Sequence, residues 1–119
     1  MPEGLLHDAL RLLVLVLIAW VVYRRFFGKI SGPRARELVS AGALLVDVRS
    51  PGEFGAGHIE GAKNIPVSDL GSRLGELGED KARPIVVYCA SGMRSASAAS
   101  TLKRAGFQQV FDLGGMSRW

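Results

Sequence analysis

One stretch, IVVYCASGMRS at residues 85–95, decides the fold of this chain. It begins with the β-branched run 85–87, and an alanine-rich segment at residues 96–105 follows it. The pattern predicts a strand, a tight turn and a helix, which places Cys89 at the carboxyl end of the strand. Ligands of open α/β sheets bind at this edge, where loops leave the sheet and the amino ends of helices point into a crevice.

The cysteine loop, residues 89–95, contains the residue types that activate a thiol. If the residues after Cys89 curl into a loop, their N–H groups and the positive end of the next helix favour a negatively charged sulfur. Arg94 adds a permanent positive charge, Gly92 gives the backbone freedom, and Ser95 is expected to cap the helix. The loop predicts that Cys89 is a thiolate nucleophile, and the alternative is a small buried cysteine that only packs.

The cysteine loop resembles the active-site loop of the rhodanese (thiosulfate sulfurtransferase) family. Further stretches that resemble the family stand in the expected order: Asp47-Val48-Arg49, Glu53-Phe54, residues 57–62, Asn64-Ile65-Pro66, Gly114-Gly115 and Trp119. The likeness extends from about Gly32 to the last residue. It implies an α/β, three-layer rhodanese-like fold in which helices flank a central, mainly parallel sheet.

The resemblance also implies an activity. Cys89 would take sulfane sulfur from a donor such as thiosulfate or a persulfide, carry it as a persulfide, and pass it to cyanide or a thiol. The family implies anion stabilisation by Arg94 and a supporting role for Asp47 and Arg49. It implies substrate binding by the amides and helix N-terminus of the loop, at Ala90, Ser91, Gly92, Met93 and Ser95. No metal or organic cofactor is implied, and with one cysteine in the chain the acceptor must come from outside it.

Two other functions fit parts of the pattern. Cysteine phosphatases and arsenate reductases of related fold also hold an arginine in the loop, but the phosphatase signature has one residue more than the four between Cys89 and Arg94. The shorter ring favours sulfur over phosphate. A membrane-tethered binding or regulatory module with this fold is the second alternative, although such modules usually lack the cysteine.

Glu53 and His58 suggest a carboxylate–histidine pair, and a histidine titrates near neutral pH. His58 lies, however, in a stretch that resembles a structural turn of the family. We therefore expect hydrogen-bonded packing at His58 rather than acid–base catalysis.

Length and composition fit one small domain behind an apolar amino-terminal segment. The chain has 119 residues, of which 48% are hydrophobic, and this suits a packed core. Its net charge of +4 is modest, and without a long basic run or an aromatic platform we expect no nucleic-acid partner. The single cysteine excludes an internal disulfide and suits a reducing compartment. We expect an anchor with its basic flank at residues 1–30 and the rhodanese-like domain at residues 31–119.

The amino-terminal segment predicts a single-pass membrane anchor. Residues 12–23 are an unbroken apolar run, and a lipid-embedded helix over residues 5–27 reaches the length of about 20 residues that a bilayer requires. Basic residues follow at Arg24, Arg25, Lys29, Arg34 and Arg36, so the positive-inside rule predicts a cytoplasmic domain. A cleaved signal peptide, a buried core helix and an interfacial helix are the alternatives. The acidic start and the lack of a polar face argue against them.

The rest of the chain predicts alternating helices and strands. Strands are predicted at residues 43–48, 62–65 and 110–113, and Asp47 at the end of the first needs a partner. A short helix is expected to follow a cap at Ser31 or Gly32 and to end at Gly42. Another is expected to carry Leu70, Leu74 and Leu77 on one face, with Ser68 or Asp69 as its cap. A cap at Gly106 and a turn at Gly114-Gly115 complete the pattern.

Overall fold

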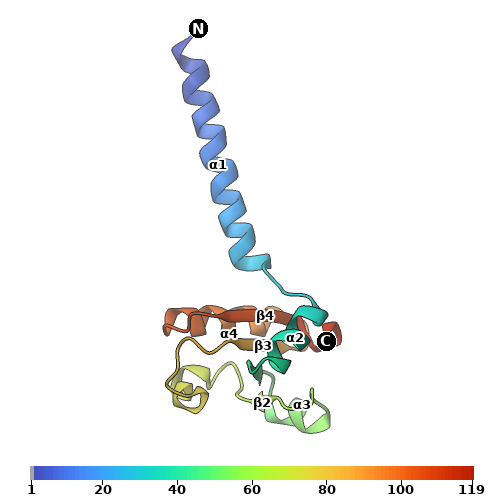
Figure 1. The fold of residues 1–119 in the computed structure, drawn as a ribbon. Helices are drawn as coiled ribbons and strands as arrows, with labels where there is room; N and C mark the ends of the chain where they lie inside the picture. The colour runs from blue at the N-terminus through green and yellow to red at the C-terminus, as the bar shows by residue number, and fades with distance from the viewer. Residues whose placement is uncertain (1) are drawn as a thin grey trace.

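The computed structural model describes residues 2–119, apart from the side chains of residues 24–27. Its centre is a four-stranded sheet in the order β2-β1-β3-β4, and every neighbouring pair of strands is parallel. The strands are β1 (Leu44–Asp47), β2 (Lys63–Asn64), β3 (Ile85–Cys89) and β4 (Val110–Gly115). All five residues of β3 are buried, as expected for a continuous apolar run in a parallel sheet. The carboxyl ends of these parallel strands therefore meet at one edge of the sheet (Figure 1). Cys89, the last residue of β3, is at that edge.

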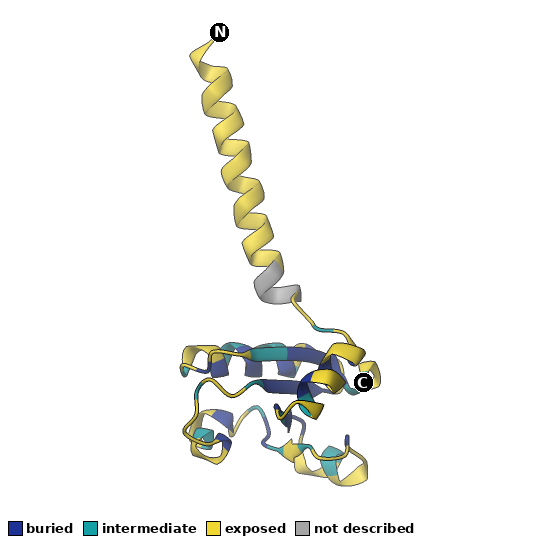
Figure 2. Ribbon diagram, viewed as in Figure 1, coloured by how far each residue is buried: buried dark blue, intermediate teal, exposed yellow. Residues whose placement is uncertain are grey.

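Helices cover both faces of the sheet. The main ones are α2 (Gly32–Ser40), α3 (Pro51–Ala56) and α4 (Met93–Arg104). Successive strand side chains point to opposite faces. Val46, Val87 and Cys89 accordingly join a core under α4, whereas Leu45, Val86 and Tyr88 join a second core that includes residues of α2. Figure 2 shows buried strands between largely exposed outer surfaces. The predicted three-layer α/β fold is confirmed.

Helix α1 (Glu3–Phe27) extends away from the domain (Figures 1 and 2). The side chains described along it are exposed, and the stretch Glu3–Tyr23 is long and apolar enough to cross a membrane. A soluble core helix would bury such a surface, but α1 buries none of it within the described chain. Arg24 and Arg25 of the predicted basic flank lie outside the described side chains.

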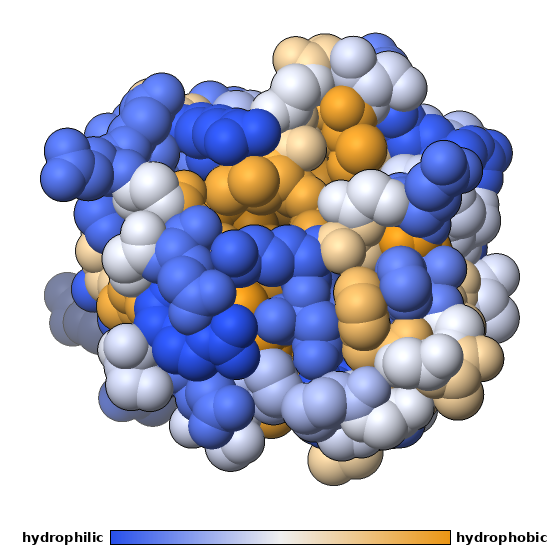
Figure 3. All heavy atoms as spheres, turned by 90° about the horizontal axis from the view of Figure 1, so that it is seen from below, coloured by the Kyte–Doolittle hydropathy of each residue, from blue (hydrophilic) through white to orange (hydrophobic). Residues whose placement is uncertain are grey.

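The face of the domain turned away from α1 is mostly hydrophilic. In Figure 3, the largest group of apolar atoms lies in the upper middle of this face, and smaller apolar patches lie toward its edges. The contrast with the largely apolar stretch Glu3–Tyr23 of α1 agrees with a polar domain attached to an apolar helix.

Two predictions of local structure are wrong. In place of the helix expected at Leu70–Leu77, the chain forms two short 3-10 turns, η1 (Leu70–Ser72) and η2 (Leu74–Leu77), and Asp69 makes no side-chain cap. Glycines at 71, 75 and 78 account for this, since glycine disfavours a continuous helix. The turn expected at Gly114-Gly115 is also absent, because both residues belong to β4. The pairing of β4 with β3 shifts its register between Val87 and Tyr88.

The segment between α1 and α2 is attached to the sheet. Lys29 forms an isolated parallel bridge with Asp112, and the Ile30 amide donates to the Asp112 carbonyl over 2.9 Å. Ser31 then caps α2 by accepting the Arg34 amide, as predicted. At the other end of the chain, β4 leads into the 3-10 turn η3 (Met116–Arg118), and Trp119 packs against the core on the α2 side. The segment at residues 29–30, early in the sequence, and β4, late in the sequence, thus lie side by side.

Candidate active site

The turn from β3 into α4 folds back onto the sulfur of Cys89. Cys89 is the last residue of β3, and Gly92 is the N-cap residue of α4. Gly92 has a φ of 103°, a left-handed conformation that glycine adopts readily. Its amide donates a hydrogen bond to Cys89 Sγ over 2.9 Å. The predicted loop therefore exists, and at least one of its amides points inward.

The surroundings of Cys89 lower the pKa of its thiol below the ordinary value. Burial by itself raises this pKa, because a charged sulfur loses hydration. The hydroxyl and amide of Ser95 and the amides of Gly92 and Ser91 act in the opposite direction and outweigh burial. The site therefore favours the anionic form of the sulfur.

Ser95 contributes differently from the prediction. It does not cap α4, because the helix begins at Met93 and Ser95 is already inside its first turn. Its hydroxyl lies 3.1 Å from the Gly92 carbonyl oxygen and also within reach of Cys89. A hydroxyl has one proton, so it donates to one acceptor at a time, and an ionised sulfur attracts that proton more strongly than a carbonyl.

The sulfur is enclosed in this structure. The side chain of Cys89 is fully buried, while Ala90, Ser91 and Met93 are exposed on the outer side of the loop. Of these, the Ser91 amide approaches the sulfur, and the Met93 side chain points into solvent. A small molecule therefore reaches Cys89 Sγ only when neighbouring side chains or loop residues move aside.

Arg94 forms an ion pair with Glu53 of α3. Its two terminal nitrogens donate to the two carboxylate oxygens over 2.7 and 2.9 Å. Glu53 also closes a capping box with Ser50 at the start of α3, so the carboxylate is held from two sides. The Arg94 hydrogen bond, followed by the Ser50 amide, lowers the pKa of Glu53 to about 2. The pKa of Arg94 is raised, chiefly by Glu53, and the charge of Cys89 contributes as well.

Asp47 and Arg49 form a buried ion pair on the α2 side of the sheet. Arg49 Nη2 lies 2.7 Å from Asp47 Oδ2, and the Arg49 amide donates to the other carboxylate oxygen over 2.9 Å. The hydrogen bond to Asp47 is the main reason why the pKa of Arg49 is raised. Arg49 also donates to the Gly57 carbonyl over 2.7 Å and lies over the ring of Tyr88. The partner that Asp47 was predicted to need is thus Arg49.

This pair is separated from the sulfur by the sheet itself. Tyr88 belongs to the core on the α2 side, whereas Cys89 belongs to the core on the α4 side. Arg49 contacts Tyr88, and the Tyr88 hydroxyl accepts the Ile59 amide over 3.1 Å. Asp47 and Arg49 therefore fix the strand ends and the loop after α3 from behind, which fits a supporting position.

Glu53 and His58 do not form a pair. The His58 ring stacks on Phe54 with centroids 3.7 Å apart, and its Nδ1 lies 2.8 Å from the Phe54 carbonyl oxygen. Glu53 instead faces Arg94. His58 thus makes the packing and hydrogen-bonding contacts expected of it.

One residue beside the loop was not predicted as part of the site. The ammonium of Lys29 lies against Gly92, on the side where a β-carbon would project. The sequence places Lys29 in the basic flank of the predicted anchor, before the stretch that resembles the family, so no local motif connects it with Cys89. Only the pairing of Lys29 with β4 brings it there.

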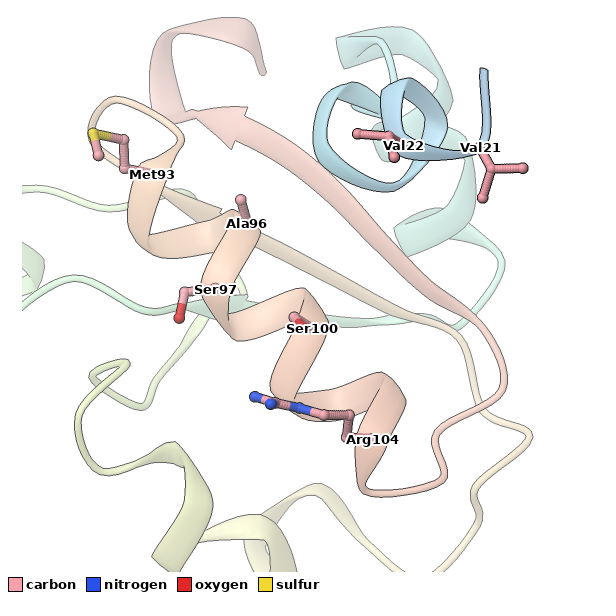
Figure 4. Close-up of a pocket in the computed structure, with 7 residues that line it drawn as sticks. All are labelled: Val21, Val22, Met93, Ala96, Ser97, Ser100 and Arg104. Atoms are coloured by element: carbon pink, nitrogen blue, oxygen red, sulfur yellow. The ribbon is translucent and has the colours of Figure 1, made fainter. Parts of the chain in front are cut away.

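A hollow between α1 and α4 lies outside this site. Val21 and Val22 face it from α1, and Met93, Ala96, Ser97, Ser100 and Arg104 line it along the outer side of α4 (Figure 4). Cys89 does not line this hollow, so we do not assign the chemistry to it. Among the described residues, no cluster of three or more His, Cys, Asp or Glu side chains is arranged to hold a metal ion.

The fold and the cysteine loop together define a family of domains. The family model of the rhodanese-like domain matches residues 33–119, and the chain belongs to this family, which confirms the resemblance. The uncharacterized protein YqhL of Bacillus subtilis is 40% identical over 110 residues, covering 89% of this chain and 83% of YqhL. The match to YqhL is longer than residues 33–119 alone and so includes part of the preceding segment.

Similar proteins include sulfurtransferases. The thiosulfate sulfurtransferase GlpE of Ectopseudomonas mendocina is 38% identical over 94 residues, which covers 78% of this chain and 84% of GlpE. Among solved structures, the human single-domain sulfurtransferase TSTD1 matches with a TM-score of 0.66 at 31% identity, covering 76% of this chain and 90% of TSTD1. These relatives support sulfurtransferase activity.

Proposed function

We propose that this protein moves sulfane sulfur from a thiosulfate-like donor to a thiophilic acceptor through a persulfide on Cys89. The observation that carries the proposal is the hydrogen bond of 2.9 Å from the Gly92 amide to Cys89 Sγ, within a loop that lowers the pKa of the thiol. A thiolate is the nucleophilic form of cysteine, and it requires such donors when it is buried.

The reaction has two steps. The Cys89 thiolate attacks the outer sulfur of thiosulfate, the S–S bond of the donor breaks, and its electron pair leaves with sulfite. Cys89 then carries a persulfide anion. In the second step cyanide or a thiolate attacks the outer sulfur, a new C–S or S–S bond forms, and the Cys89 thiolate is released.

The loop suits both forms that Cys89 takes in this cycle. Thiolate and persulfide are each anions on the same side chain, and inward N–H groups stabilise either one without rearrangement. Arg94 offsets part of the negative charge, while Asp47 and Arg49 hold the strand ends. Since the chain has one cysteine, it cannot resolve the persulfide internally, and the acceptor is a separate molecule.

The test is sulfur loading of the purified protein. After incubation with thiosulfate, mass spectrometry is expected to find one added sulfur atom on Cys89, which cyanide removes as thiocyanate. Cys89→Ser is expected to lose both loading and transfer while remaining folded. A binding module would bind no sulfur, and a chain that stays unmodified at Cys89 under these conditions contradicts the proposal.

The arrangement of Arg94 argues against phosphatase activity. Both terminal nitrogens of Arg94 are bound to Glu53, so the guanidinium is not free to clamp a phosphate in the loop. We expect no hydrolysis of aryl phosphates that depends on Cys89. A Cys89-dependent phosphatase rate above the sulfur-transfer rate would reverse this assignment.

We further propose that α1 anchors the domain to a membrane, with the domain on the cytoplasmic side. The exposed apolar surface of Glu3–Tyr23 supports the anchor. The basic residues that follow it support the cytoplasmic orientation of the domain. The protein is expected to stay with membranes after carbonate extraction. Recovery of the intact chain in the soluble fraction would contradict the anchor.

A further inference from the structure

Lys29 extends its side chain across the two glycines that border the site. A β-carbon on Gly92 would collide with Lys29 Nζ and stand 3.2 Å from Cε, and one on Gly114 would stand 2.9 Å from Cδ. Both glycines have positive φ, of 103° and 88°. Gly92 is also the residue whose amide donates to Cys89 Sγ. The ammonium therefore lies next to Gly92, the residue whose amide binds the sulfur.

The backbone fixes Lys29 in this place. Lys29 bridges to Asp112 of β4, and the Ile30 amide donates to the Asp112 carbonyl over 2.9 Å. Arg118 Nη2 donates to the Ile30 carbonyl over 3.0 Å, and Arg118 Nε donates to the Leu113 carbonyl over 2.8 Å. The segment is thus hydrogen-bonded through both the amide and the carbonyl of Ile30, which fixes the backbone from which the Lys29 side chain extends.

Among the described side chains beside the cysteine loop, Lys29 carries a charge that no ion pair compensates. Arg94 shares its charge with Glu53, and Arg118 is engaged with two backbone carbonyls. The nearest acid on β4, Asp112, accepts the Gly114 amide over 2.8 Å. Lys29 makes no ion pair with any side chain in the described part of the chain. An unpaired cation at the mouth of a site attracts anions and binds oxyanions by charge-assisted hydrogen bonds.

We infer that Lys29 is a substrate-binding residue that holds the anionic end of a sulfonate-type sulfur donor while the loop amides hold the sulfur to be transferred. The inference rests on the proposed function and narrows its donor class. In thiosulfate, the sulfur that Cys89 attacks is bonded to a sulfonate group, which must remain outside the loop during the attack. The ammonium of Lys29, outside Gly92, is placed to receive those oxygens. Donors with less negative charge gain less from it.

The test compares three variants of the full-length protein in detergent or vesicles. Lys29→Gln removes the charge, Lys29→Arg keeps it, and Lys103→Gln is the matched control, because Lys103 is an exposed lysine near the far end of α4. With cyanide as acceptor, Lys29→Gln is expected to raise the KM for thiosulfate about tenfold and to leave kcat nearly unchanged. For the singly charged donor benzenethiosulfonate the rise is expected to be smaller. Lys29→Arg and Lys103→Gln are expected to stay close to wild type.

A second measurement does not depend on sulfur transfer. The rates at which iodoacetate and iodoacetamide alkylate Cys89 are compared, because the first reagent is an anion and the second is neutral. A cation beside the site speeds the anionic reagent selectively, so Lys29→Gln is expected to lower the iodoacetate-to-iodoacetamide ratio about threefold. Lys103→Gln is expected to leave that ratio unchanged.

The outcomes separate the two proposals. If wild type transfers sulfur and Lys29→Gln matches it in KM and in the alkylation ratio, the inference about Lys29 is wrong and the proposed function stands. If wild type takes no sulfur from thiosulfate, the proposed function fails, and with it the role of Lys29 in donor binding. A raised KM for thiosulfate together with a lowered alkylation ratio in Lys29→Gln, with both values close to wild type in Lys29→Arg, supports the inference.

Discussion

Burial and hydrogen bonding act in opposite directions on the thiol of Cys89. Removal from water raises the pKa of a thiol, and a cysteine at the end of a buried strand is usually inert for that reason. Around Cys89, the Ser95 hydroxyl and three loop amides reverse the balance and lower the pKa. The reactivity that we propose is therefore a property of the residues after the strand and not of the strand.

Ser95→Ala tests this balance. The substitution removes the hydroxyl but leaves the Ser95 amide, so the pKa of the Cys89 thiol is expected to rise and alkylation at neutral pH to slow several-fold. The pH profile of alkylation by iodoacetamide measures the change. Ser97→Ala, an exposed serine on the same helix, is the control and is expected to leave the profile in place. An unchanged profile for Ser95→Ala would show that the amides alone set the pKa.

On the α2 side of the sheet, opposite Cys89, the hydroxyl of Tyr88 accepts a hydrogen bond from a buried backbone amide. Burial raises the pKa of Tyr88 to about 12, so the hydroxyl stays protonated and its oxygen accepts the Ile59 amide. Tyr88→Phe leaves that buried amide without its partner and is expected to lower the free energy of unfolding by about 1–3 kcal/mol. Urea denaturation measures this change, and a variant as stable as wild type would mean that the amide finds another acceptor.

At the scale of elements, α3 and the cysteine loop are joined by the ion pair of Glu53 and Arg94. The two residues are 41 positions apart. Both residues stand out in the sequence, but their pairing could not be predicted from it, because a contact of this range depends on how β1 and β3 align. The strand, the loop and α4 were predictable, since an apolar run followed by a glycine-containing turn specifies them locally. The helix expected at residues 70–77 was not formed, because there the apolar spacing and the glycines disagree and the glycines prevail.

Glu53→Gln removes the negative charge of the carboxylate and so tests the electrostatic part of the contact between Glu53 and Arg94. In the folded protein the pKa of Glu53 is about 2, below its ordinary value of 4.5. Its pairing therefore stabilises the fold above about pH 4.5 and loses this effect as the pH falls toward about 2. Glu53→Gln is expected to lose less stability than wild type between pH 5 and pH 3, roughly the interval in which the free carboxyl titrates, as measured by urea denaturation.

Glu76→Gln is the matched control for Glu53→Gln. Glu76 pairs with Arg73, and this pairing also lowers the pKa of Glu76 to about 2. Both variants are expected to flatten the dependence of stability on pH. Only Glu53→Gln is expected to lower the pKa of the Cys89 thiol, since it leaves the charge of Arg94 without its counterion. An equal effect of both variants on the thiol would rule out a specific link between α3 and the loop.

On the scale of the whole molecule, the segment at residues 28–32 follows the proposed anchor and is also attached to the sheet of the domain. The family pattern begins after it, at residue 33, yet Lys29 and Ile30 already pair with β4. The end of the apolar run and its basic flank predict a domain boundary after residue 30. The pairing with β4 could not be predicted, because an isolated bridge of one residue leaves no pattern in the sequence.

Two truncations test what this segment contributes. A chain that begins at Gly28 keeps Lys29, Ile30 and the Ser31 cap, whereas one that begins at Pro33 loses the Ile30 contacts with β4 and Arg118 and the hydrogen bond from the Arg34 amide to Ser31. The shorter chain is expected to be less stable by about 2–4 kcal/mol in urea denaturation, given one cap and two hydrogen bonds. It is also expected to show the raised KM for thiosulfate of Lys29→Gln, while the longer chain keeps the KM of the full-length protein. Equal stability of the two truncations would mean that the segment does not contribute to the folded domain. An equal KM would mean that the position of Lys29 beside Gly92 has no part in donor binding.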